Sequence, residues 1–167
     1  MFKADEEKSR RTRGRIRAAF SGRVREPGPY TIVYAYLLKK GIFGRKSESF
    51  VVGFSEELKE LVVVPVNYAM DEAADAIRLN RANTLSAKFG FQGEVKIRSF
   101  ILEGELRFIV PPYTPPALEN FSILPVNQET EAKEFRNFIE QLQNEIAQAA
   151  ARADARREGA GAIHLRR

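Results

Sequence analysis

The stretch Ser49–Asn67, SFVVGFSEELKELVVVPVN, decides the fold. It contains two runs rich in β-branched and aromatic residues, at positions 50–54 and 61–66, separated by a charged loop. This pattern predicts an antiparallel hairpin. Both runs are apolar at successive positions, so both faces of the second strand must be covered and it should lie inside a sheet. Pro65 cannot donate to a strand ladder, which predicts that regular pairing ends there.

Further strands and two helices are expected on either side of this hairpin. Tyr30–Leu38, YTIVYAYLL, has β-forming residues on both faces and predicts a central strand. After the hairpin, Asn67 followed by acidic residues predicts a helix start, with a helix running to about Ala82. Beyond it, the pattern predicts three more strands and then a long helix that starts near Asn127, the strands lying at 85–91, 94–102 and 105–110.

The order of these elements suggests an internal repeat. Gly41–Gly44 (GIFG) is echoed by Gly90–Gly93 (GFQG), and Pro65-Val66-Asn67 by Pro125-Val126-Asn127. We therefore expect an α+β fold of tandem β-β-β-α units, forming one antiparallel sheet or two packed sheets covered by two helices. The core domain would span residues 30–146, with duplicated halves at 30–82 and 84–146. Strand and turn chemistry alone also produces such echoes, so the repeat is a hypothesis.

The last helix has apolar residues at spacings of three and four up to Ile146, which predicts one buried side. From there its apolar residues shrink to alanine, so residues 147–167 are interpreted as a helical extension, ended by Gly159 and Gly161, and a frayed basic tail. The alanine-rich surface could pack on a second copy, which makes a homodimer through this helix a hypothesis.

The net charge of +5 is unevenly distributed along the chain. Residues 1–29 carry nine basic and four acidic side chains, residues 30–143 carry thirteen and fifteen, and residues 144–167 carry five and three. The chain has no cysteine, no stretch typical of a secretion signal, and no apolar run near the roughly 18 residues of a membrane span. We expect a soluble, cytoplasmic protein.

Residues 1–29 are interpreted as a flexible basic arm, because their central part holds eight basic residues and no acid. Ile16, Phe20 and Val24 recur every four residues, which on a helix would form a narrow apolar stripe. A cationic segment of this kind can bind phosphates by releasing counterions. The predicted polyanion-binding residues are Arg10, Arg11, Arg13, Arg15, Arg17, Arg23 and Arg25.

No catalytic signature is found in the sequence. The single histidine, His164, is the fourth residue from the end of the sequence, and without cysteine the Cys-His nucleophiles, His-based triads and ordinary zinc sites have no residues to form them. Glu103 and Glu105 flank Gly104 and could form a carboxylate pair, although a solvent-facing turn accounts for the same residues. We predict no catalytic residue, no metal and no cofactor.

Aromatic residues give a second candidate for nucleic-acid contact. Lys88-Phe89-Gly90-Phe91 resembles part of the aromatic strand motif of RNA-recognition domains, in which rings on a sheet stack on bases. It lacks the glycine that follows the basic residue of that motif, and Gln92 stands where valine is expected. Phe89 and Phe91 are therefore candidate stacking residues, with core packing as the alternative. The same two alternatives, base stacking and core packing, apply to three tyrosines that share a strand face, Tyr30, Tyr34 and Tyr36.

The sequence as a whole predicts a non-enzymatic binding or adaptor protein whose basic arm contacts nucleic acid or a nucleoprotein assembly. The Pro-rich connection PPYTPP, residues 111–116, is interpreted as a stiff crossover, with recognition by a polyproline-binding domain as the alternative. Two rival functions remain: a structural or secretion-type adaptor that binds protein only, and a carboxylate enzyme that uses Glu103 and Glu105.

Overall fold

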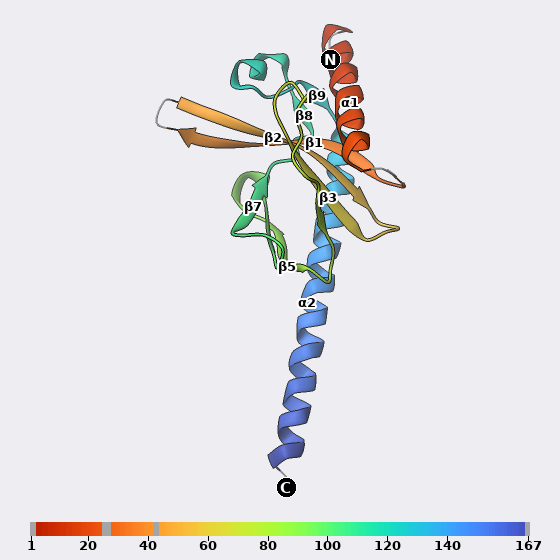
Figure 1. Cartoon of the computed structure of the whole chain (residues 1–167), viewed down its shortest axis with the longest axis vertical. Helices are drawn as coiled ribbons and strands as arrows, with labels where there is room; N and C mark the ends of the chain where they lie inside the picture. The colour runs from red at the N-terminus through yellow and green to blue at the C-terminus, as the bar shows by residue number, and fades with distance from the viewer. Residues whose placement is uncertain (1–2, 25–27, 42–43, 166–167) are drawn as a thin grey trace.

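The computed structural model describes residues 3–24, 28–41 and 44–165. It contains antiparallel sheets, a helix at each end of the chain and two short 3₁₀ turns (Figure 1). The elements are α1 (Lys3–Arg23), β1 (Thr31–Gly41), β2 (Gly44–Ser55), β3 (Glu60–Val66), β4 (Ile77–Leu79), β5 (Thr84–Phe89), η1 (Phe91–Gly93), β6 (Val95–Ser99), β7 (Glu105–Phe108), β8 (Tyr113–Thr114), η2 (Pro116–Phe121), β9 (Val126–Asn127) and α2 (Glu129–Leu165). The α+β class and the long C-terminal helix are confirmed.

The predicted hairpin is the centre of the first sheet, whose strand order is β1-β2-β3-β4. β2 and β3 pair antiparallel, with Val52 opposite Val63 and Phe54 opposite Leu61. Because successive side chains on a strand point to opposite faces, the valine-rich runs supply two cores at once. This confirms the hairpin and its covering on both faces.

The first core lies between this sheet, the three-stranded sheet β5-β6-β7 and the first half of α2. Phe135 of α2 is at its centre, with ring contacts to Phe54 at 5.6 Å and Phe108 at 6.0 Å between centroids. The 3-and-4 spacing predicted for this helix places its other buried residues, Phe138, Ile139 and Leu142, against the same core. Such spacing produces one apolar side on a helix.

The second core lies on the opposite face of the four-stranded sheet, where α1 packs. Ile16, Phe20 and Val24 are buried there against strand residues and the segment 123–126. The prediction of a flexible arm over residues 1–29 is therefore wrong for the described residues 3–24. The apolar stripe of period four outweighs the self-repulsion of the arginines, because burial of three large side chains stabilises the docked helix.

The helix predicted from Asn67 to about Ala82 does not form. Asn67 does accept from a following amide, Glu72 N–H at 3.0 Å, as a helix cap would. Here that bond closes a loop, and the chain then returns as β4, where Leu79 pairs with Leu61 of β3. An asparagine side chain that accepts from a following backbone N–H occurs in turns as well as at helix starts. Here the pairing of β4 with β3 favours the turn. Three consecutive antiparallel strands occur in both halves, β1-β2-β3 and β5-β6-β7, and the first half adds β4. The duplication stays a prediction.

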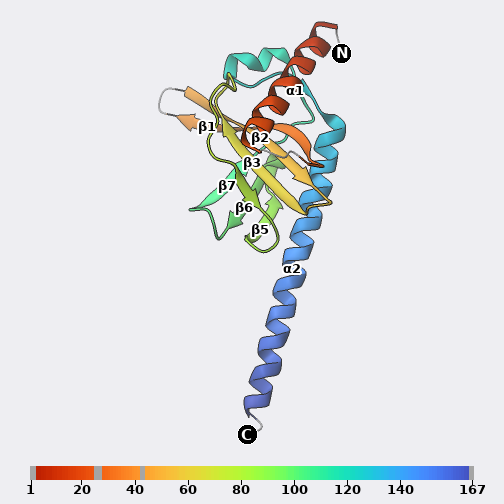
Figure 2. The same cartoon turned by 45° about the vertical axis from the view of Figure 1, so that its right-hand side comes forward.

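Helix α2 extends well beyond the body (Figures 1 and 2). Side chains from residue 147 to residue 159 are exposed, which agrees with a weakly packed extension. Gly159 and Gly161 do not end the helix, which continues to Leu165, while residues 166–167 lie outside the described residues. Within the described part of the chain, no helix is both long and apolar enough to span a membrane.

Candidate polyanion-binding surface

Several of the arginines predicted to bind a polyanion hold α1 on the body instead. Arg13 donates to the carbonyl of Asn127 at 2.8 Å, Arg15 to that of Ala69 at 2.6 Å, and Arg23 to that of Ala73. Carbonyl oxygens of the loop that replaces the expected helix thus accept from Arg15 and Arg23. A guanidinium occupied in this way must break those bonds before it can bind a phosphate with the same donors.

Arg13 also pairs with Glu131 in the first turn of α2. Burial alone would raise the pKa of Glu131, but the hydrogen bond from Arg13, a backbone N–H and the charges of Arg13 and Arg17 together lower it below its ordinary value. The ion pair therefore joins the two helices in a partly buried place.

The remaining arginines of the predicted set differ in their surroundings. Arg11 lies 3.5 Å from Glu7, one helical turn before it, and both side chains are largely exposed. Arg10 and Arg17 form no ion pair or hydrogen bond with the residues that the structure describes. Arg25 lies outside the described residues. Whether any of these side chains binds a polyanion stays a prediction.

A second group of basic side chains lies on the outer surface of the three-stranded sheet. The strand register places Lys88 opposite Lys96, and Lys96 opposite Arg107, so three cations lie in one row across the sheet. Arg98, two residues from Lys96, lies on the same surface. We call the surface formed by Lys88, Lys96, Arg98 and Arg107 the cationic face.

Acidic residues compensate only part of the cationic face. Arg107 donates to Glu105 at 2.7 Å and lies 3.8 Å from Glu94. Lys88, Lys96 and Arg98 form no ion pair with any described residue. Like charges directly opposite one another destabilise a sheet. A row of three is therefore a feature that folding alone does not favour.

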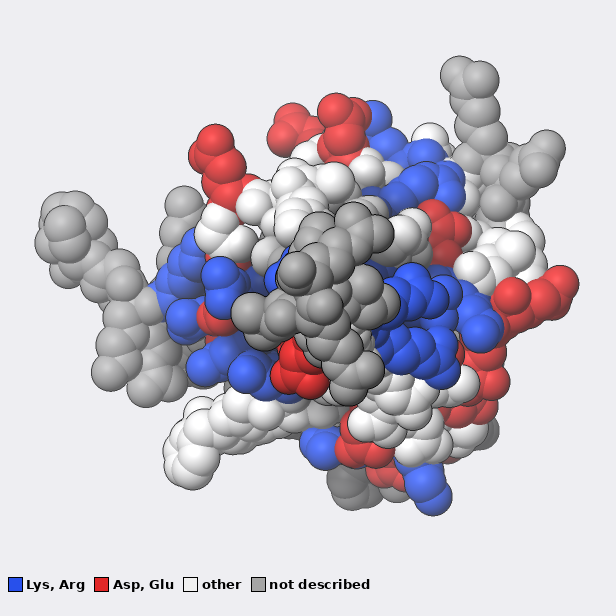
Figure 3. All heavy atoms as spheres, turned by 90° about the horizontal axis from the view of Figure 1, so that it is seen from below, with Lys and Arg blue, Asp and Glu red and all other residues white. Residues whose placement is uncertain are grey.

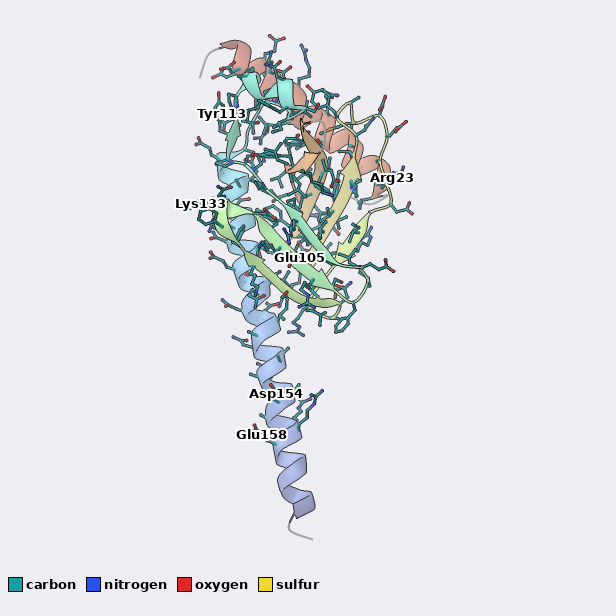
Figure 4. All side chains as sticks on the ribbon, turned by 90° about the vertical axis from the view of Figure 1, so that its left-hand side faces the viewer. Arg23, Glu105, Tyr113, Lys133, Asp154 and Glu158 are labelled. Atoms are coloured by element: carbon teal, nitrogen blue, oxygen red, sulfur yellow. The ribbon has the colours of Figure 1, made fainter. Side chains whose placement is uncertain are left out.

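The surface views agree with a separation of basic regions. Seen along α2 from its C-terminal end, basic side chains gather in separate areas instead of covering the surface evenly (Figure 3). Glu105 lies on the sheet surface turned toward the viewer in Figure 4, with Lys133 of α2 to one side. Arg23 of α1 lies on the other side of the body. Arg23 and Glu105, the partner of Arg107 in the cationic face, thus lie on different parts of the molecule.

The two candidate stacking residues have different environments. Phe89 packs in a T-shaped contact on Phe135 at 6.3 Å between centroids, and the guanidinium of Arg136 covers its ring at 4.4 Å. Phe91 is 88% exposed at the β5–β6 turn, where Gln92 has a φ of 65°. Of the two candidates, Phe91 has the exposed ring, and it lies in the turn that joins the strands of Lys88 and Lys96.

Tyr34 and Tyr36 of β1, and Tyr30 just before it, are structural in their contacts. Tyr34 is fully buried, and its hydroxyl lies 3.1 Å from the Ser49 hydroxyl and accepts from the Leu124 N–H at 3.3 Å. Burial raises the pKa of Tyr34 and of Tyr36, and burial together with the Glu60 carboxylate raises that of Tyr30. The buried Tyr34 ring leaves no open stacking platform on this strand.

The two residues of the proposed carboxylate pair have different surroundings. Gly104 has a φ of 75°, so Glu103 lies in the turn before β7. Glu105 is bound to Arg107, and it lines a cavity whose lining residues do not include Glu103. Positive φ at a glycine is typical of a turn, which is the alternative that the sequence left open for these residues.

The cationic face was not identified from the sequence. Its four residues lie on three strands, and only the register shows that they are neighbours. Period-two spacing of Lys96 and Arg98 was the one signal available beforehand. A comparison of the chain with protein families, characterised proteins and solved structures found no match.

Proposed function

We propose that this chain is a non-enzymatic binding protein whose cationic face contacts nucleic acid. The observation that carries the proposal is the row Lys88–Lys96–Arg107, in which like charges lie opposite one another without full compensation. Binding of phosphates would relieve this repulsion and release counterions. The proposal keeps the nucleic-acid partner expected from the sequence and moves the contact from residues 1–29 to the sheet.

A single strand is the form of nucleic acid that this surface favours. Surfaces that bind single strands without sequence preference combine a basic track with aromatic rings on which bases stack. Phe91 supplies one exposed ring, in the turn between the strands that carry Lys88 and Lys96. A short strand crossing the sheet would place phosphates on the basic row and a base on Phe91.

Salt-dependent binding of a fluorescein-labelled 20-nucleotide oligothymidine tests the proposal by anisotropy. The variant Lys88→Gln/Lys96→Gln/Arg98→Gln should bind more weakly, with a slope of log K against log salt that is smaller by about 2, since each phosphate contact on a single strand contributes roughly 0.7. The matched control is Arg10→Gln/Arg11→Gln/Arg17→Gln on α1, which removes the same charge. Equal losses in both variants would show that binding follows net charge, and would refute the assignment.

The substitution Phe91→Ala provides a second, independent test of the proposed binding surface. Base stacking on an aromatic ring is worth about 1–3 kcal/mol, so affinity should fall roughly five- to 150-fold while the salt slope stays unchanged. Unchanged affinity would remove Phe91 from the site without removing the basic row.

A protein adaptor is the second candidate, favoured by the exposed extension of α2. Such a protein would bind its partner through the helix and keep that binding when the cationic face is neutralised. The triple variant above therefore separates the two functions.

A further inference from the structure

Strand β1 pairs at one point with Ile109, the residue that follows β7, and the two segments then separate. The backbone N–H of Tyr36 donates to the Ile109 carbonyl at 3.0 Å, and the Ile109 N–H donates back to Tyr36 at 2.8 Å. No further bridge joins the two strands among the described residues. Beyond this point, the β1–β2 hairpin extends away from the body, with β7 below it in Figure 1.

This separation leaves two strand edges with unused hydrogen-bonding groups. On an antiparallel strand, alternate residues point their N–H and C=O groups to opposite sides. Since Tyr36 and Ile109 bond to each other, the groups of Leu38 and Arg107, two residues further along the gap, also point into it. Neither residue has a backbone partner on that side within the described residues.

Two residues before Tyr36, at Tyr34, the hydrogen-bonding groups on the same edge of β1 are occupied by a side chain. The side-chain amide of Gln128 accepts from the Tyr34 N–H at 2.9 Å and donates to the Tyr34 carbonyl at 2.8 Å. Tyr34 and Tyr36 are therefore both satisfied, and Leu38 is the next outward-facing position toward the β1–β2 turn.

A cavity of about 510 Å³ lies at the same place. Leu37, Phe50 and Leu106 give it an apolar floor, and charged side chains surround it. Two of its acids are already paired, Glu48 with Lys39 at 2.8 Å and Glu105 with Arg107 at 2.7 Å. The buried Oε1 atom of Glu94 accepts no hydrogen bond in the described part of the chain. Its contact with Arg107 is 3.8 Å long.

We propose that an extended peptide with alternating apolar and basic residues binds here, adding a strand to the β1 edge at Leu38. An extended backbone supplies the donors and acceptors that an open strand edge lacks. Its apolar side chains would cover Leu37, Phe50 and Leu106, and a lysine or arginine would meet Glu94. This site borders the nucleic-acid surface and shares Arg107 with it, but the inference does not depend on nucleic-acid binding.

Phage display of random eight-residue peptides on the full chain tests this inference, with the Leu38→Pro variant as counter-selection. Proline removes the Leu38 N–H but no bond of the β1–β2 ladder, because that N–H points away from β2. The enriched peptides should alternate apolar and basic residues. They should bind Leu38→Ala, which keeps the N–H, at least tenfold more tightly than Leu38→Pro.

Two measurements keep the test independent of how well Leu38→Pro folds. A synthetic copy of an enriched peptide, N-methylated at alternate amides, should lose at least tenfold in affinity for the unmodified chain, since a methylated amide cannot pair with a strand edge. Glu94→Gln should weaken binding of the unmethylated peptide. The inference is overturned by a selection that enriches nothing, by equal binding to the two Leu38 variants, or by N-methylation without effect.

Discussion

The ring of Phe20 lies directly over the backbone of Gly53 in β2. A Cβ atom added at Gly53 would overlap the Cε2 and Cζ atoms of this fully buried ring. Gly53→Ala should therefore lower the free energy of unfolding by about 1–3 kcal/mol, the usual cost of overpacking. Urea denaturation followed by far-UV circular dichroism measures the change, and unaltered stability would mean that α1 is not docked as described.

Gly14 in α1 is the matched control for that substitution. Nothing lies within 4 Å of a Cβ added there. Because glycine costs a helix interior about 0.5–1 kcal/mol relative to alanine, Gly14→Ala should raise stability by that amount. The opposite signs at Gly53 and Gly14 would distinguish steric conflict from a general effect of alanine.

Glu131 should make stability depend on acid pH. Its pKa is lowered in the folded protein, so its contribution is present above the unfolded value of about 4.5 and is lost as pH falls through the lower folded value. Glu131→Gln should thus reduce Tm at pH 7 more than at pH 3. Glu7→Gln, which affects only the exposed pair with Arg11, is the control and should change Tm little at either pH.

At the scale of elements, removal of residues 1–24 should prevent stable folding. Each fully buried apolar side chain contributes about 1.5–3 kcal/mol, and Ile16, Phe20 and Val24 are all lost. Their sum is comparable to the 5–15 kcal/mol by which domains are stable. Circular dichroism and solubility after expression should show an unfolded or aggregated product, whereas a soluble, fully folded truncation would contradict the docking of α1.

Truncation after Ile146 should have a much smaller effect. The exposed side chains from residue 147 to residue 159 contribute no core contacts, and an isolated helix of this length is only marginally stable in water. The free energy of unfolding should therefore change by less than about 1 kcal/mol.

Sedimentation of both forms tests the homodimer hypothesis, because a dimer that becomes a monomer on truncation would assign the interface to this segment. Asp154 and Glu158 lie on it in Figure 4.

Sequence reasoning succeeded where one pattern had one structural outcome. The valine-rich runs of β2 and β3 and the spacing around Phe135 fit only a covered strand and an amphipathic helix. It failed where local chemistry serves two structures, as at Asn67, and around Phe20, where the apolar stripe was recognised but the charge run was given more weight. The cationic face was not predicted for a third reason: its residues are neighbours across strands, and the sequence alone does not show the strand register.

For the whole molecule, the four-stranded sheet should make unfolding a single event. β2 and β3 contribute to both cores, with Val51 on one face and Val52 on the other. Neither core can therefore be lost without removing support from the second. Tyrosine fluorescence and far-UV circular dichroism should give coincident urea transitions. Separate transitions, with α1 released first, would contradict this expectation.

Charge is distributed over the molecule in a way that linear counting did not show. The basic excess of residues 1–29 is partly consumed by contacts with the body, as for Arg13 and Arg15. The nearly neutral body instead contains the cationic face. Deletion of the first 29 residues cannot separate nucleic-acid binding from protein binding, because it would also remove α1.

The amide of Gln128 acts as a two-atom substitute for a missing neighbour of β1. Because Tyr34 and Gln128 are both buried, this pairing satisfies backbone groups that water cannot reach. Gln128→Leu should therefore leave an N–H and a carbonyl without partners inside the protein, and a lower melting temperature would be the measurable consequence.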